Sequence, residues 1–159
     1  MGYTPGMSRL TATLLMLTCL GWGCGKSSES AIQEATTSKY HPGEEYSFEG
    51  RPADDQPRFL VLKVDAHPKL GNIVHVSISG IRIKNAQAPK GYFDHVQHFP
   101  MAEPALEKSK AKRIKSENTV PDFQSAYQEW RKPFDQGKAG IWSVPLAECL
   151  QAMEQSMNR

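Results

Sequence analysis

No uncharged hydrophobic run in this sequence is long enough to cross a bilayer comfortably. The longest, residues 10–23, falls short of the ~20 apolar residues that a transmembrane helix needs. Arg9 precedes this run, and small and polar residues follow it from Gly25 to Ser30. A short apolar run with a positive charge before it and small residues after it is typical of an export signal, not of a permanent membrane anchor.

The chain also lacks an excess of charge of one sign. It carries 19 basic and 17 acidic residues, for a formal net charge of +2. Binding to a phosphate backbone requires a clustered basic surface, so we expect no nucleic-acid partner. The single basic run, from Lys108 to Lys115, is interpreted as a solvated helix face.

Motifs of the common catalytic sites are missing as well. The sequence has no Gly-x-Ser-x-Gly motif and no glycine-rich phosphate loop. Cys149 has no histidine near it in sequence, so we interpret it as a small buried hydrophobe instead of a nucleophile. We therefore predict no cofactor and favour a protein that is not an enzyme, although distant segments can still assemble a catalytic site.

The strongest motif surrounds the second of the three cysteines. Residues 20–24 read Leu-Gly-Trp-Gly-Cys, and Gly23 is a small residue directly before Cys24. This segment resembles the signal peptide of bacterial lipoproteins, in which such a cysteine receives a diacylglycerol. The family pattern places leucine three positions before the cysteine, whereas this chain has Gly21 there and Leu20 one step earlier. An ordinary secretory signal with an incidental cysteine is the alternative.

The resemblance implies a cellular address and a membrane partner. Residues 1–23 would be the signal peptide, with Met1 or Met7 as its start, and Cys24 would hold the mature protein to the membrane. Gly25 after the lipidated position resembles the outer-membrane lipoproteins of Gram-negative bacteria, which implies a domain that faces the periplasm. Cys19 leaves with the signal, so no internal disulfide is expected.

The mature chain is predicted to consist of a tether and one domain. Residues 24–39 are polar and are expected to form a flexible tether, and residues 40–159 a single globular domain. Alternating apolar residues predict a short strand around Tyr46 and an antiparallel hairpin over residues 58–84. The apolar phase slips by one residue at Gly80, which predicts a β-bulge there.

Helical periodicity replaces strand alternation after a predicted long connection over residues 85–101. We expect a helix over 102–115, a second after Asp122 and a third that opens at Pro145. The second helix carries an aromatic stripe that we expect in the core: Phe123, Tyr127, Trp130 and Phe134. The predicted class is α+β, a small antiparallel sheet packed on one face by about three C-terminal helices.

Three segments of this domain are similar to an uncharacterised family of small bacterial proteins. They are residues 78–85, 98–100 and 121–137, which read Ile-Ser-Gly-Ile-Arg-Ile-Lys-Asn, His-Phe-Pro and a Pro-Asp-Phe to Phe-Asp-Gln-Gly helix. The resemblance implies a genuine domain and transfers no site residues.

Histidines suggest one candidate site. His95 and His98 lie close together with Asp94 beside them, and His75 lies on the neighbouring predicted strand. Imidazole and carboxylate ligands suit zinc or copper. The spacing is common, however, and loop histidines more often bond to the backbone or to water.

A polar strand face suggests a second candidate. It comprises His75, Ser77, Ser79, Arg82 and Lys84, all on the side opposite the apolar residues of the predicted hairpin. This face can meet a partner, or it can simply be solvated. The leading hypothesis is a non-catalytic binding or interaction module for a protein or a small ligand at the membrane surface. The alternative is a metal-binding protein or metal-dependent enzyme that uses His95 and His98.

Overall fold

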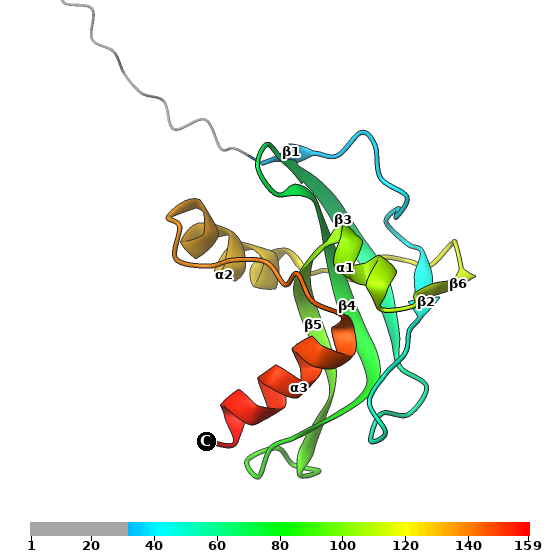
Figure 1. Cartoon of the computed structure of the whole chain (residues 1–159), viewed down its shortest axis with the longest axis vertical. Coiled ribbons are helices and arrows are strands. Elements are labelled where there is room, and N and C mark those ends of the chain that lie inside the picture. The colour runs from blue at the N-terminus through cyan, green and yellow to red at the C-terminus, as the bar shows by residue number, and fades with distance from the viewer. Residues whose placement is uncertain (1–31) are drawn as a thin grey trace, which may run out of the picture.

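A computed structural model describes residues 32–159, and it confirms the α+β class (Figure 1). The predicted signal peptide over 1–23 and the lipidated Cys24 lie outside these residues. One antiparallel sheet has the strand order β5-β4-β3-β2-β6, and β1 pairs with the same edge of β3 as β2 does. The strands of the described chain are β1 (Gln33–Glu34), β2 (Glu45–Ser47), β3 (Arg58–His67), β4 (Gly71–Lys84), β5 (Tyr92–Ala102) and β6 (Lys112–Lys115). The helices are α1 (Glu103–Lys108), α2 (Gln124–Asp135) and α3 (Leu146–Met157).

The predicted hairpin over 58–84 is the centre of this sheet. β3 and β4 pair antiparallel from Arg58 opposite Ser79 to His67 opposite Gly71. The predicted irregularity near Gly80 is also present, because the register between β4 and β5 shifts between Ser79 and Ile83. Gly80 has a φ of +70°, and a Cβ built there would lie 2.6 Å from the carbonyl oxygens of Asp55 and Gln56. Glycine is needed here because the 50–57 loop packs directly on the bulge.

The sheet is larger than a small hairpin, because β1, β5 and β6 all form where we predicted other structure. The predicted connection over 85–101 contains most of β5, whose register to β4 shifts between Val76 and Ile78. That shift interrupts the alternation that sequence analysis relies on. The predicted helix over 102–115 ends as α1 at Lys108, and Lys112–Lys115 pairs with β2 as β6. Pairing with a strand distant in sequence overrides the local helix preference.

Ordered structure begins before Tyr40, within the segment predicted to be a tether. Ile32 is buried, and Gln33 and Glu34 pair with Ala66 and Asp65 of β3. The side chain of Asn72 donates hydrogen bonds to the Thr37 carbonyl and to Glu103, which attaches the following turn to β4 and α1. Residues 32–39 therefore belong to the folded domain.

The helices cover both faces of the sheet, which corrects the prediction that all three pack on one face. α1 and α3 bury Leu106, Leu146 and Leu150 in the main core. Val74 and Val76 of β4 point into this same core. His75 lies between them in an extended strand, so it points to the opposite face, where α2 contacts it.

The aromatic stripe of α2 therefore packs outside the main core. Tyr127 is buried, whereas Phe123, Trp130 and Phe134 are only half-buried. The rings of Tyr127 and Trp130 lie against His75 and His98 instead of against the aliphatic residues of the core. The shared helical face was predicted correctly, but its environment is polar.

Candidate functional site

A buried polar cluster lies between α2 and the face of the sheet opposite the main core. Asp65 of β3 and His75 of β4 are both 0% exposed, which is unusual for charged or titratable residues unless they are paired. A register shift between Val61 and Lys63 turns Lys63 and Asp65 to the α2 side. β5 adds His98 to the same cluster.

The three central side chains form a chain of short contacts. Nε2 of His75 lies 3.2 Å from Oδ2 of Asp65. Among the described residues, this nitrogen has no partner in hydrogen-bonding geometry. Nδ1 of His75 lies 2.9 Å from Nε2 of His98, and their rings are nearly parallel. Lys63 donates a hydrogen bond to the other carboxylate oxygen of Asp65. The cluster therefore satisfies much of its own polarity.

Side chains of α2 close this cluster from the outside. The hydroxyl of Tyr127 donates to Oδ2 of Asp65 at 2.6 Å, and Arg131 donates to the same hydroxyl at 2.8 Å. The ring of Trp130 lies 4.9 Å from that of His75, and its Nε1 donates to the carbonyl of Gly140. α2 is thus attached to the sheet largely through polar and aromatic contacts.

Burial keeps both histidines neutral at physiological pH. Together with the positive charges of Lys63 and Arg131, it lowers the pKa of His75 to about 3. The pKa of His98 falls to about 4, first through burial and then through the neighbouring His75. Burial also lowers the pKa of Lys63. The two neutral imidazoles can share one hydrogen bond with each other, but with these pKa values they are weak bases at neutral pH.

The structure separates the histidines that we predicted as metal ligands. His98 contacts His75, whereas His95 pairs with Asp94 at 3.0 Å, with 61% of the His95 side chain exposed. Asp94 also forms an ion pair with Lys90. Within residues 32–159, no group of three or more histidine, cysteine, aspartate or glutamate side chains is arranged to hold a metal ion.

The predicted polar strand face divides into two regions. His75 is buried beneath α2 and is unavailable to a partner, whereas Ser79, Arg82 and Lys84 are exposed. Ser77 is half-buried. Arg82 and Lys84 lie in the last part of β4, which extends beyond β3 because the pairing of the two strands stops at Ser79. They lie beside an open cavity of about 690 Å³ together with Tyr92 of β5.

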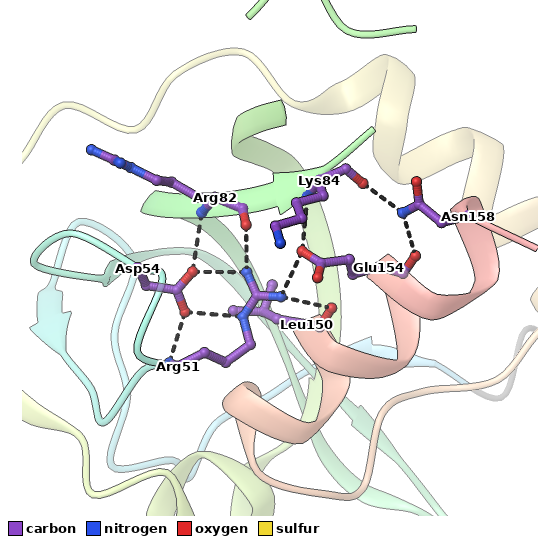
Figure 2. Close-up of polar contacts among 7 residues, drawn as sticks. All are labelled: Arg51, Asp54, Arg82, Lys84, Leu150, Glu154 and Asn158. Carbon is purple, nitrogen blue, oxygen red and sulfur yellow. Dashed lines mark hydrogen bonds and ion pairs between the residues drawn. The ribbon is translucent and has the colours of Figure 1, made fainter. Parts of the chain in front are cut away.

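The backbone of these two residues is held by side chains in place of a neighbouring strand (Figure 2). Asp54 accepts from the Arg82 N–H at 3.0 Å, and Arg51 donates to the Arg82 carbonyl at 2.9 Å. Glu154 of α3 accepts from the Lys84 N–H at 2.8 Å, and Asn158 donates to its carbonyl at 2.7 Å. The backbone N–H and C=O groups of both residues therefore have hydrogen-bond partners at this strand edge.

Arg51 is the centre of this second network. Its guanidinium pairs with Asp54 at 2.8 Å and with Glu154 at 3.2 Å. Its side chain is 8% exposed and that of Asp54 is 0% exposed. Hydrogen bonds from Arg51 hold the pKa of Asp54 below its ordinary value, although burial alone would raise it.

Sequence analysis missed most of the residues in these two networks. Lys63 and Asp65 interrupt an otherwise apolar strand, which was a visible indication of polar burial on one face. Arg51 and Asp54 are three residues apart in a turn, a spacing that permits a local ion pair. Glu154 gave no indication, because its partners come from segments distant in sequence.

The thiol of Cys149, the cysteine within residues 32–159, is inert. Cys149 is 0% exposed and donates to the carbonyl of Val144, and burial raises its pKa to about 12. None of the helices in residues 32–159 is long and apolar enough to cross a membrane.

Comparison with known proteins adds no relative. No protein-family model, curated protein or solved structure matches this chain.

Proposed function

We propose that this chain is a lipid-anchored protein of the cell envelope whose folded domain is a non-catalytic binding module. The anchor is supported by the resemblance of residues 20–24 to a lipoprotein signal, with Cys24 as the lipidated residue. The outer membrane, with the domain facing the periplasm, is the proposed address in a Gram-negative cell. The binding role is supported by the open cavity beside Arg82 and Lys84.

The position of this cavity is the observation that carries the proposal. The connection between β4 and β5 that lines it lies at the end of the domain opposite β1, where the described chain begins (Figure 1). A domain held to a membrane through its N-terminal end would present this cavity to the aqueous side. Such a placement suits capture of a ligand or partner from solution.

The histidine cluster favours a structural role over catalysis. A general base works best with a pKa near the working pH, and the pKa values of His75 and His98 are about 3 and 4. They hydrogen-bond to each other, and His75 lies 3.2 Å from Asp65, beneath the rings of α2. We assign this cluster to the attachment of α2.

Replacing the proposed lipidation site tests the anchor. Cys24→Ser is expected to leave export intact and to shift the protein from the membrane to the soluble fraction, because an acyl-bearing residue provides the hold on the bilayer. Membrane fractionation and incorporation of labelled fatty acid measure this. Cys149→Ser is the matched control and should keep both label and fractionation. Label that persists in Cys24→Ser, or is missing from the wild type, would refute the anchor.

Site-specific photo-crosslinking in intact cells tests the binding role. A benzophenone amino acid replacing Tyr92, beside the cavity, is expected to give a discrete adduct that mass spectrometry detects on the purified protein. The same probe replacing Lys69, in the turn between β3 and β4 at the other end of the domain, is the control and should give none. No adduct at position 92, or the same adducts at both positions, would contradict a binding module.

A further inference from the structure

The cavity beside Arg82 and Lys84 has the size of a small-molecule site. Its volume of about 690 Å³ lies between the 50–57 loop and the end of the β4–β5 hairpin. A second cavity of about 600 Å³ adjoins it along α3, and the two share Lys84 and Asn158. Volumes of roughly 300–1,000 Å³ are typical of sites for small ligands.

The walls of the cavity are fixed before any ligand arrives. The N–H and C=O groups of Arg82 and Lys84 face away from β5, and all four form hydrogen bonds with side chains (Figure 2). The partners are Asp54 and Arg51 for Arg82, and Glu154 and Asn158 for Lys84. The buried ion pair between Arg51 and Asp54 joins the 50–57 loop to this strand. A fixed backbone lowers the ordering cost of binding, which is the physical basis of preorganisation.

The side chains that project from this frame are cationic and aromatic. The Arg82 guanidinium lies 5.5 Å from the centre of the Tyr92 ring. Within residues 32–159, neither Arg82 nor Lys84 forms an ion pair with a carboxylate. Asp54 and Glu154 are nearby, but Arg51 contacts both of their carboxylates. Two positive charges are therefore available to a ligand.

The geometry points to an anionic small molecule as the occupant of this cavity. We propose that a carboxylate or phosphate group binds between Arg82 and Lys84, and that an apolar or ring portion lies against Tyr92 and Pro52. A guanidinium offers paired donors that match both kinds of oxyanion. This proposal rests on the binding role proposed above and names the class of ligand for it.

Titration with simple probes tests the ligand class. Phenyl phosphate and benzoate are titrated into the purified full chain, with benzamide as the neutral analogue, and binding is followed by NMR shifts of the amides in residues 80–93. Both anions are expected to shift these amides, and benzamide is expected to bind at least tenfold more weakly. The ratio of the two anion affinities distinguishes a phosphate ligand from a carboxylate ligand.

Two double variants with the same change of charge provide the comparison. Arg82→Gln with Lys84→Gln is expected to weaken binding of the preferred anion at least tenfold. Lys69→Gln with Lys115→Gln, two exposed lysines away from the cavity, should change it less than twofold. Arg82→Lys keeps the charge without the planar fork and should fall between them. The amide spectrum of each variant confirms that it is folded.

Several results would overturn the proposal. They are equal binding of benzamide and the anions, equal loss in both double variants, shifts that map outside residues 80–93, or no shift with either anion at millimolar concentrations. An adduct from the crosslinker at position 92 without any anion binding would refute the ligand class alone. Absence of that adduct would refute the binding role itself.

Discussion

Acidification from pH 7 to pH 5 is expected to lower the free energy of unfolding by about 2 kcal/mol through His75 alone. The pKa of this histidine is about 3 in the folded protein, against an ordinary value of 6.5. The folded state therefore binds fewer protons than the unfolded chain. Its stabilisation is complete above pH 6.5 and is lost as the pH falls from there towards the folded pKa. His98, with a folded pKa of about 4, acts in the same direction.

The groups around His75 support a loss of stability on acidification. Asp65, at 3.2 Å, favours the protonated imidazole, but Lys63 and Tyr127 already donate to its carboxylate. Arg131 adds a second positive charge on the α2 side, and His98 meets the other ring nitrogen. With the ring 0% exposed, desolvation opposes the imidazolium and determines the direction.

Urea denaturation at pH 7, 6 and 5 measures this effect, because in that range the carboxylates of the unfolded chain remain largely ionised. His75→Gln is expected to flatten the pH dependence, and His98→Gln, at a less buried position, should do so in part. His95→Gln removes an exposed histidine that pairs with Asp94 and is the control, which should not flatten the pH dependence as His75→Gln does. A wild-type stability that is flat between pH 7 and pH 5 would contradict the assignment.

The sequence indicated the local elements of this fold better than the partners they would find. Alternation over 58–84 predicted the hairpin, and the phase slip at Gly80 predicted its irregularity, because both depend on neighbours in sequence. β6 could not be recognised in Lys112–Lys115, since its pairing with β2 is a long-range contact. The same limit applies to β5, where the register shift near His98 hides the alternation.

The histidine cluster and the Arg51 network also depend on contacts between segments distant in sequence, which the sequence did not indicate. The predicted metal group joined His98 to His95 and Asp94, which are close in sequence, and also to His75. The structure places His98 against His75 across the β4–β5 pairing, whereas His95 pairs with Asp94 at the surface. Arg82 and Lys84 were identified by strand alternation, whereas the side chains that hold their backbone come from a loop and a C-terminal helix.

Removal of the Asp54 carboxylate is expected to cost ~3–5 kcal/mol of stability, because it breaks a buried ion pair and leaves a buried charge. Asp54 accepts hydrogen bonds from the backbone and side chain of Arg51 and from the N–H of Arg82. In Asp54→Ala, the guanidinium of Arg51, on a side chain only 8% exposed, keeps Glu154 as its single carboxylate partner among the described residues. The N–H of Arg82 loses its acceptor as well.

Asp55→Ala is the matched control, because it removes a carboxylate of the same size and charge from the next position of the same loop. Asp55 is exposed, and its backbone N–H, which bonds to Gly80, is unaffected by the substitution. Chemical denaturation is expected to show a change within ~0.5 kcal/mol for Asp55→Ala. Arg51→Met with Asp54→Leu removes both charges and should destabilise less than Asp54→Ala alone, since the charge left without an ion-pair partner is then that of Glu154, whose side chain is 19% exposed against 8% for Arg51. If Asp54→Ala costs under ~1 kcal/mol, the pair behaves as a solvated surface contact, and the fixed frame of the cavity is refuted with it.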